Sequence, residues 1–135
     1  MKHIESTEQI ALFKWIDLSL NKYPQLKLIS ASMNAAKRSV IQASLMKKSG
    51  LRAGVPDIFL AYPSGIYHGL FIEMKSKSTL ITKTGKTSVK RGRFSESQIR
   101  WIDNLREVGY AVDVCYTWLE AKDTILSYLN VKCLN

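Results

Sequence analysis

The sequence has few of the residues that build disulfide frameworks, metal-thiolate sites or fibrous structures. It contains two cysteines, three prolines and seven glycines in 135 residues. Neither Cys115 nor Cys133 has a spacing to His3 or His68 that is typical of a metal site. No apolar run approaches the roughly 20 residues of a membrane-spanning helix, and the first residues lack a signal-peptide apolar region. We therefore expect a cytoplasmic protein with reduced thiols and no membrane association.

What the chain does contain is enough apolar sequence for one core. Hydrophobic residues make up 46% of the chain and aromatic residues 10%, which is typical of a globular protein. A chain of this length buries roughly two thirds of its unfolded surface in a single core, and we interpret residues 1–135 as one domain. Trp15, Trp101 and Trp118 fall on amphipathic stretches, where core or interface packing is more usual than stacking on bases.

Acidic residues are scarce in the middle of the chain. Twenty lysines and arginines against eleven acids give a net charge of +9, yet residues 18–95 contain only two acids, Asp57 and Glu73. So positive a balance favours a polyanion as partner, most often nucleic acid. Two carboxylates within a phosphate-binding surface would repel it unless they bind a divalent cation. The alternative is that they pair with neighbouring lysines or arginines, and the charge pattern alone does not choose between these readings.

Apolar periodicity predicts an α/β fold in the order αβαββαβα. We expect helices over 7–21 and 35–48 and from Ser95 and Thr117, and strands over 26–32, 57–62, 69–75 and 110–116. Capping-box patterns begin the first and third helices, and Gly50 and Gly109 end the second and third. Residues 76–94 are polar, with six basic residues, and we interpret them as a long mobile loop.

The strands over 57–62 and 69–75 form a predicted hairpin. With the turn centred near Gly65 and Ile66, paired residue numbers add up to about 130 or 131. If they add up to 130, Asp57 lies opposite Glu73 on one face with Cα atoms roughly 5 Å apart, and Lys75 projects to the same side. A slip by one residue would instead place Asp57 on the opposite face.

Two carboxylates meeting at the open end of a hairpin would suit Mg²⁺ or Mn²⁺, together with the backbone carbonyl of Met74, because these cations prefer hard oxygen ligands. Such a cation activates water and neutralises phosphate charge, and the ammonium of Lys75 can orient the water or stabilise the transition state. This combination indicates phosphodiester hydrolysis. The alternative is that Glu73 and Lys75 form an ordinary exposed polar pair on a sheet.

Three motifs of this chain resemble the VRR-Nuc family of the PD-(D/E)xK nuclease superfamily. They are Gly54-Val55-Pro56-Asp57, Glu73-Met74-Lys75 after an apolar strand, and Gln98 at a helix start. Glu8, Asn34, Arg38 and the tail from Gly109-Tyr110 to Tyr128-Leu129 extend the match. The resemblance implies an αβββαβ core, a mixed sheet flanked by helices, to which residues 35–48 add a helix between the first and second strands. The segment 76–94 is longer than the resemblance leads us to expect.

The resemblance also implies roles for individual residues. The catalytic set would be Asp57, Glu73, Lys75 and Gln98. The metal ligands would be Glu8, Asp57, Glu73 and the backbone carbonyl of Met74. Glu8 could reach the cation through water, or be only an acid in a first helical turn, and Gln98 could instead be only the capping-box partner of Ser95.

The basic residues before and after the site are candidates for holding DNA phosphates. This set is Arg38, Lys47, Lys48, Arg52 and Lys77. The alternative for the helical members is a solvated helix face. The lysines and arginines of residues 76–94 could close over DNA as a flap or remain disordered.

Stand-alone members that resemble this chain suggest a phage or bacterial enzyme for DNA recombination and repair, with Mg²⁺ or Mn²⁺ and no organic cofactor. We expect a homodimer that cuts branched DNA, above all four-way junctions, because two symmetric sites can cut paired strands. The alternatives are a flap- or nick-directed nuclease, a restriction-type nuclease with the same core, and a non-catalytic module that only binds nucleic acid.

Overall fold

The computed structural model describes residues 2–32, 39–81, 87–91 and 94–130, with side chains in these ranges apart from 2–6, 77–81 and 87–91. The elements in chain order are α1 (Lys2–Leu18), the 3-10 helix η1 (Pro24–Leu28), β1 (Ile29–Ala31), α2 (Val40–Lys48), β2 (Ile58–Leu60), β3 (Leu70–Met74), β4 (Lys77–Ile81), β5 (Thr87–Arg91), α3 (Glu96–Glu107), β6 (Ala111–Cys115) and α4 (Trp118–Tyr128). The mixed α/β fold with a helix between the first two strands is confirmed.

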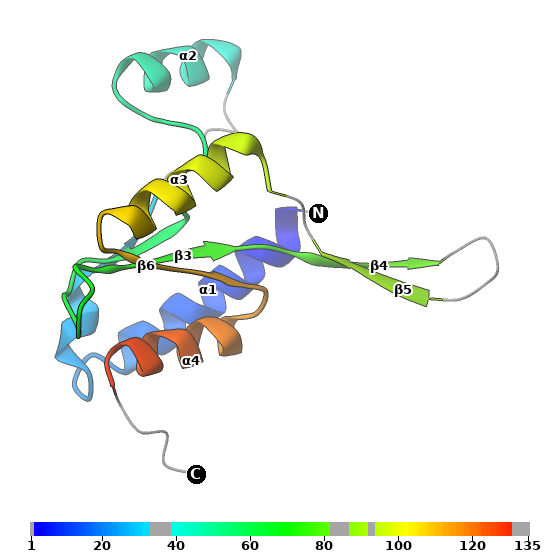
Figure 1. Ribbon diagram of the computed structural model, residues 1–135. Helices are drawn as coiled ribbons and strands as arrows, with labels where there is room; N and C mark the ends of the chain where they lie inside the picture. The colour runs from blue at the N-terminus through cyan, green and yellow to red at the C-terminus, as the bar shows by residue number, and fades with distance from the viewer. Residues whose placement is uncertain (1, 33–38, 82–86, 92–93, 131–135) are drawn as a thin grey trace.

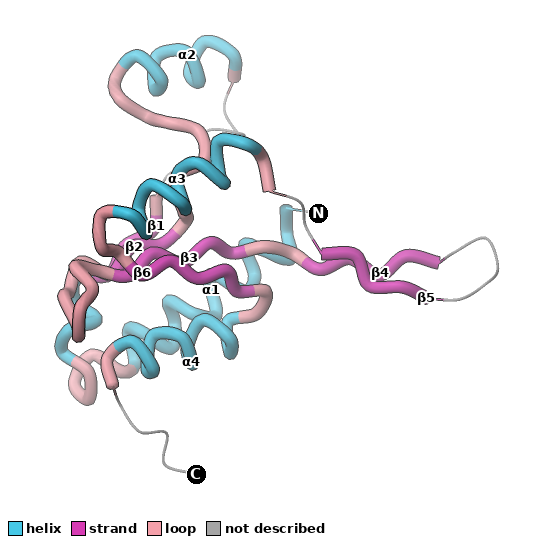
Figure 2. The backbone as a smooth tube through the Cα atoms, viewed as in Figure 1, coloured by secondary structure: helices cyan, strands magenta, loops and turns pink. Residues whose placement is uncertain are grey.

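A four-stranded sheet in the order β1-β2-β3-β6 forms the centre of the molecule (Figure 2). β1, β2 and β3 pair antiparallel, whereas β3 and β6 pair parallel because α3 carries the chain back across the sheet. α1 and α4 cover one face and α3 covers the other (Figure 1). None of the helices in the described ranges is long and apolar enough to cross a membrane.

Two hydrophobic clusters hold this three-layer arrangement together, because side chains alternate between the faces of each strand. The larger cluster, between the sheet and α1 and α4, contains Leu12, Ile16, Leu26, Ile58, Leu60, Leu70, Ile72, Met74, Cys115, Ala121 and Ile125. The smaller cluster, beneath α3, contains Ile102, Leu105 and Val112 with Phe71, Phe94, Trp101 and Tyr110 against them. β3 is therefore buried on both faces, and a polar side chain at its end enters a largely apolar surrounding.

The predicted hairpin has the register that brings Asp57 and Glu73 to one face. Ile58 pairs with Ile72 and Leu60 with Leu70, so the paired numbers add up to 130. At the turn, Ser64 pairs with Tyr67, and these two numbers add up to 131. The register therefore shifts by one residue between the turn and the strands. Gly65 has φ +58°, a conformation that suits glycine in a tight turn.

Several predicted boundaries are corrected by the structure. α1 begins at Lys2, so the capping-box pattern at residues 6–9 lies inside the helix and does not start it. α2 begins after Ser39, whose hydroxyl accepts from the backbone N–H of Gln42, and the predicted helical residues 35–38 lie outside the described residues. The first strand is shorter than predicted because residues 24–28 form a 3-10 turn. The starts of α3 and α4, at the N-caps Ser95 and Thr117, are confirmed.

The prediction of a loop over residues 76–94 is wrong. β4 and β5 form an antiparallel ribbon in which Lys77 pairs with Arg91 and Ile81 with Thr87. The ribbon extends away from the main sheet (Figure 1). Both segments contain strand-forming threonine, valine or isoleucine, and this preference outweighed the high charge on which the loop prediction depended.

Candidate active site

The end of β3 brings the predicted acids and lysine to the face of the sheet that α3 covers. Phe71 belongs to the cluster beneath α3, so Glu73 and Lys75, two and four residues further on, project to the same face. Phe59 of β2 stacks on Phe71 with ring centroids 4.3 Å apart. Asp57, two residues before Phe59, shares that face and falls opposite Glu73 when the observed register is continued.

Asp57 is fixed by contacts to both neighbouring strands. Its Oδ2 accepts from the backbone N–H of Met74 at 2.9 Å. Its backbone carbonyl accepts from the N–H of Ser32 at 2.7 Å, which continues the β1–β2 pairing. With its backbone bonded to one strand and its short side chain to the other, Asp57 has little freedom to turn away, so the carboxylate stays at the end of β3.

Because of Pro56, the backbone carbonyl of Met74 accepts no sheet hydrogen bond from the segment that leads into β2. The hydrogen bond from Ser32 to Asp57 shows that the backbone N–H and C=O of Asp57 point toward β1. Those of Pro56, the preceding residue, therefore point toward β3. The continued register places Pro56 opposite Met74, and proline has no N–H to donate. The Met74 N–H is already bonded to the side chain of Asp57. A carbonyl oxygen thus lies beside two carboxylates at one sheet end.

Glu73 is the buried charged residue among the described side chains, with only 3% of its surface exposed. Its Oε2 accepts from Nε2 of Gln98 at 3.3 Å. The Oε1 of the same amide accepts from Nζ of Lys75 at 3.0 Å, and this ammonium also lies 5.0 Å from the ring centroid of Phe94. One glutamine therefore holds a buried carboxylate and an ammonium in fixed relation, which is unlike an ordinary exposed ion pair.

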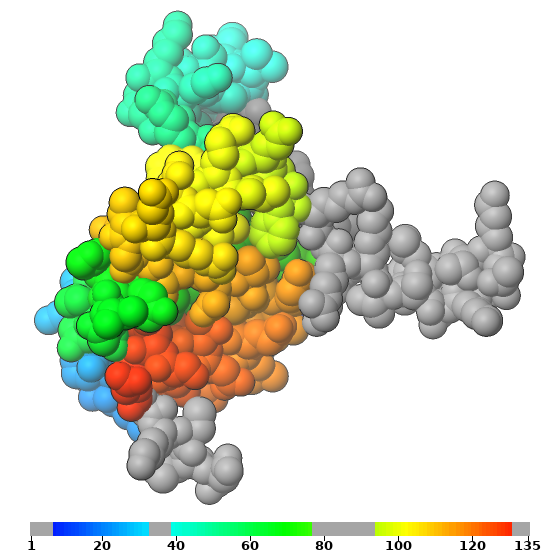
Figure 3. All heavy atoms as spheres, in the orientation of Figure 1, coloured from blue at the N-terminus to red at the C-terminus, as the bar shows by residue number. Residues whose placement is uncertain are grey.

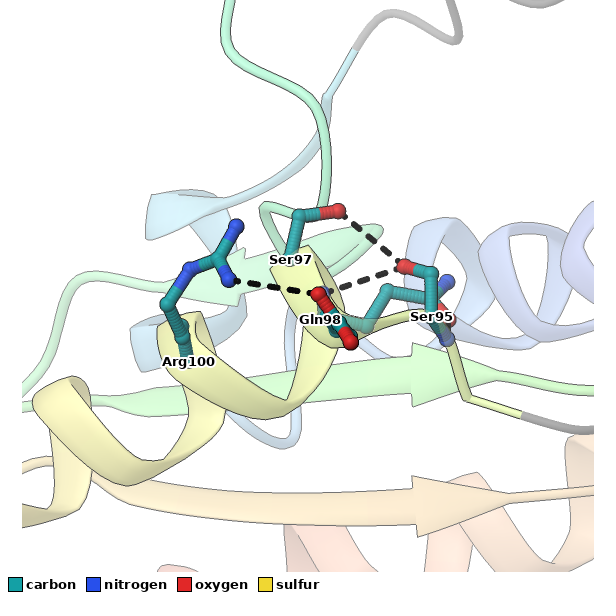
Figure 4. A network of polar contacts seen from close by, with 5 residues as sticks. Ser95, Ser97, Gln98 and Arg100 are labelled. Carbon is teal, nitrogen blue, oxygen red and sulfur yellow. Dashed lines mark hydrogen bonds and ion pairs between the residues drawn. The ribbon is translucent and has the colours of Figure 1, made fainter.

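Gln98 combines the two roles that the sequence left open. Its Oε1 also accepts from the backbone N–H of Ser95 at 2.9 Å, and Ser95 Oγ accepts from the N–H of Gln98 at 3.2 Å. These two bonds form a capping box at the start of α3 (Figure 4). The cap fixes the backbone and the side-chain amide of Gln98, so this amide contacts Glu73 and Lys75 from a fixed position.

Gly54 allows the segment before Asp57 to lie directly on α3. It has φ +94°, and a Cβ at this position would lie 2.5 Å from the carbonyl carbon of Ser97 and 2.8 Å from the backbone nitrogen of Gln98. Only glycine permits so close an approach of backbone to backbone. This contact holds the segment that leads to Asp57 against the first turn of α3, where Gln98 lies.

Glu8 lies near the same end of the sheet but has a structural partner. Its Oε2 accepts from the backbone N–H of Trp118 at 2.7 Å, at the first residue of α4. Because α1 begins at Lys2, Glu8 is not in a first helical turn, and that alternative is wrong. Its proposed contact with a cation through water stays a prediction.

The predicted DNA-binding residues fall on the segment that leads to Gly54. Lys47 and Lys48 are exposed in the last turn of α2. Arg52 is exposed, and its Nη1 donates to the carbonyls of Lys47 at 3.1 Å and Leu51 at 3.4 Å. Arg38 and the side chain of Lys77 lie outside what the structure describes.

The donor set fits a hard divalent cation better than zinc. Two carboxylates and a backbone carbonyl offer oxygen only, as Mg²⁺ and Mn²⁺ prefer, and such cations commonly keep several waters. Within the described residues, no three or more histidines, cysteines and acids form a group that could bind a metal. Burial raises the pKa of Cys115, which keeps this nearby thiol neutral.

Two residues of the site were not found from the sequence. The Ser32 hydroxyl donates to the carbonyls of Pro56 and Asp57 at 3.2 and 3.3 Å, and nothing in its sequence context indicated this. Phe94 was detectable in principle, because an apolar residue directly before the N-cap Ser95 is typical of a hydrophobic staple.

Comparison with known proteins yields a family and a fold. Residues 4–118 match the family model described as the VRR-NUC domain. A solved structure described as a VRR_NUC domain protein is similar with a TM-score of 0.69 and 23% sequence identity, over 95% of this chain and 89% of that chain. No curated protein matches the chain.

Proposed function

Since the chain belongs to the VRR-NUC family of nucleases, we propose that it is a Mg²⁺- or Mn²⁺-dependent endonuclease that hydrolyses phosphodiester bonds in branched DNA. Four-way junctions, as formed in recombination and repair, are the proposed substrate. The observation that carries the proposal is the convergence of four side chains at the end of β3. They are Asp57, Glu73, Lys75 and Gln98.

The cation would be held by the carboxylates of Asp57 and Glu73 and the carbonyl of Met74, with Glu8 contributing through water. When bound, it would neutralise phosphate charge and activate a water molecule. The support for this ligand set is chemical: the carboxylate of Glu73, which is 3% exposed, and that of Asp57 share one face at the ends of two paired strands. Two acids on one face favour a divalent cation between them, because like charges disfavour each other's ionised form.

Lys75 is proposed to stabilise the negative charge that develops on the phosphate. Its ammonium is held by Oε1 of Gln98 at 3.0 Å and lies over the ring of Phe94, so few orientations remain open to it. A cation fixed in advance stabilises a transition state without reorganising during the reaction. Gln98 acts as a positioning residue, since it sets the relation between Lys75 and Glu73.

The basic segment before the site is proposed to hold the DNA backbone. Lys47, Lys48 and Arg52 are exposed and precede Gly54, which lies against α3 beside Gln98. Phosphate contacts of this kind set the register of the duplex without reading sequence. Arg38 and Lys77 remain part of the proposal on sequence grounds.

A homodimer is proposed, with α2 in the contact between the two copies. α2 has no buried residues, and Val40, Ile41 and Leu45 are 87%, 74% and 59% exposed. The helix projects from one end of the molecule (Figure 3). Apolar side chains on a projecting helix favour burial against a partner, and a two-fold arrangement would present two active sites to a junction.

The test compares junction, flap, nicked and linear duplex DNA in Mg²⁺, Mn²⁺ or chelator. We expect cleavage of the junction in either cation and none in chelator. Asp57→Asn and Lys75→Ala should abolish cleavage while DNA binding in Ca²⁺ persists, whereas the exposed control Lys27→Ala should cut normally. Equal cleavage by the Asp57 and Lys75 variants would discard the proposed mechanism, and cutting at one fixed sequence in linear duplex would replace the substrate assignment.

A further inference from the structure

A cavity of about 540 Å³ lies on α3 next to the candidate active site. It is lined by Arg52, Ala53, Ser97, Arg100, Trp101, Asn104, Leu105 and Val108. The five residues from α3 and its C-cap Val108 follow one another at intervals of three and one, which places them on one side of the helix. Arg52 and Ala53, from the loop before Gly54, form the opposite wall. The volume is in the range of about 300–1,000 Å³ that small-molecule sites occupy.

The lining combines positive charge with an apolar, partly aromatic floor. It contains two arginines and no carboxylate, and Trp101, Leu105 and Val108 supply the apolar part. Arg100 lies 3.9 Å from Glu96, with side chains 68% and 95% exposed, a pair too exposed to hold the guanidinium firmly. Arg52 uses Nη1 for its backbone contacts, and a guanidinium has five N–H donors. Such a lining fits an anion that carries a flat apolar ring, as a nucleotide does.

A second cavity shows by contrast why this one suits a phosphate. The second cavity, of about 780 Å³, includes Asp113 and Asp123 in its lining and Arg106 as its basic residue. Nη2 of Arg106 donates to the backbone carbonyl of Val112 at 2.8 Å. Two carboxylates against one engaged arginine repel a phosphate, so the larger cavity does not share the proposed ligand.

The first turn of α3 separates the cavity from the catalytic residues. Ser97 lines the cavity, and Gln98, the next residue, holds Lys75 and Glu73. Figure 4 shows Ser97 and Arg100 on the upper side of α3, away from the strands drawn below it. Arg52 is five residues from Asp57, and a chain of that length spans at most about 18 Å. A nucleotide in the cavity would therefore be a near neighbour of the phosphate that is cut.

Resting on the nuclease function proposed above, we propose that this cavity binds one unpaired nucleotide of the DNA beside the cleavage position. The base lies against Trp101 and its phosphate contacts Arg52 and Arg100. A base that is stacked and paired in a duplex cannot enter a cavity of this kind. A base at a branch point has lost a stacking neighbour and leaves its pair at lower cost, and a base that is already unpaired enters at the lowest cost. The cavity thus selects branched over linear DNA. Trp101 packs against the smaller cluster, as the sequence favoured, and also faces this cavity.

The test measures binding in Ca²⁺ of two DNAs of equal length, one fully paired and one with a single unpaired 2-aminopurine. The affinity of the protein for the second DNA should be about tenfold higher or more, the size expected of one stacked base. The fluorescence of the 2-aminopurine should fall on binding, because the base would stack on Trp101. Val108→Glu should remove the preference, because it places a carboxylate at the cavity from a side chain that is 61% exposed. Leu119→Glu is the matched control, since it makes the same charge change on α4 at a position 53% exposed.

Arg100→Glu is a second variant in case Val108→Glu lowers the thermal stability, and it should also remove the preference. No preference by the unaltered protein, or an equal loss on Val108→Glu and Leu119→Glu, overturns the assignment. The binding assay involves no cleavage, so the two proposals fail separately. Retained preference with no cleavage in Mg²⁺ would overturn the nuclease function alone, and cleavage of junctions without any preference would overturn the cavity alone.

Discussion

Replacing Gln98 by leucine tests whether this residue positions the catalytic groups or only caps a helix. Leucine is similar in volume but can neither donate to Glu73 nor accept from Lys75, contacts of 3.3 and 3.0 Å in the native protein. A hydrogen bond to a charged group contributes about 1.5–3 kcal/mol. If the bridge positions Lys75 in the transition state, kcat for junction cleavage should fall by roughly 10- to 150-fold.

The same substitution also removes the capping box, so stability needs its own control. Loss of an N-cap contact costs about 0.5–2 kcal/mol. Ser95→Ala removes the hydroxyl that accepts from the backbone N–H of Gln98, while the amide of Gln98 keeps its contacts to the site. Both variants should therefore lose free energy of unfolding in urea, and Gln98→Leu should lose more because the buried carboxylate of Glu73 also loses a donor. Only Gln98→Leu should lose kcat at saturating DNA.

The measurements are urea unfolding and single-turnover cleavage at a temperature where both variants are folded. KM should change little, because neither Gln98 nor Ser95 is proposed to bind DNA. If Ser95→Ala reduced kcat as much as Gln98→Leu, helix stability alone would explain the effect. If Gln98→Leu cut at the native rate, the bridge between Glu73 and Lys75 would have no part in catalysis.

Two further predictions concern the segment before the site. Gly54→Ala should lower the free energy of unfolding by about 2 kcal/mol or more, because the new Cβ would meet the α3 backbone at 2.5 Å and φ is +94°; an unchanged melting temperature would contradict this packing. Replacing Lys47, Lys48 and Arg52 together by alanine should reduce the slope of log K for duplex binding against log salt by about 2–3. A slope equal to that of the control variant in which the exposed Lys14, Lys22 and Lys27 are replaced by alanine would reject the phosphate contacts.

The hairpin illustrates how much local sequence can determine. Asp57 and Glu73 are sixteen residues apart, yet their meeting followed from turn residues near Gly65 and from strands that alternate with a period of two. A hairpin is a local structure, so its register depends on the residues between its ends. The capped starts of α3 and α4 were predicted for the same reason, because a cap is a contact between residues three apart.

Contacts between distant segments could not be predicted in this way. The bond from Glu8 to the N–H of Trp118 joins residues far apart in the chain, and its pattern could be interpreted equally as a first-turn acid. The ribbon of β4 and β5 was missed because the predicted loop weighed charge above strand preference. The cavity on α3 exists only because the loop at Arg52 lies against a helix that the chain reaches some forty residues later.

The sequence by itself determined the order of the main-sheet strands and the helices around them, the hairpin register and the identity of the two acids and the lysine, since each depends on near neighbours and on side-chain chemistry. Tertiary structure alone decided that one amide would bridge the buried carboxylate of Glu73 and the ammonium of Lys75. It also decided that Gly54 would bring the loop onto α3. These arrangements follow from the packing of α3 on the sheet, which depends on the shapes of surfaces brought together from distant parts of the chain.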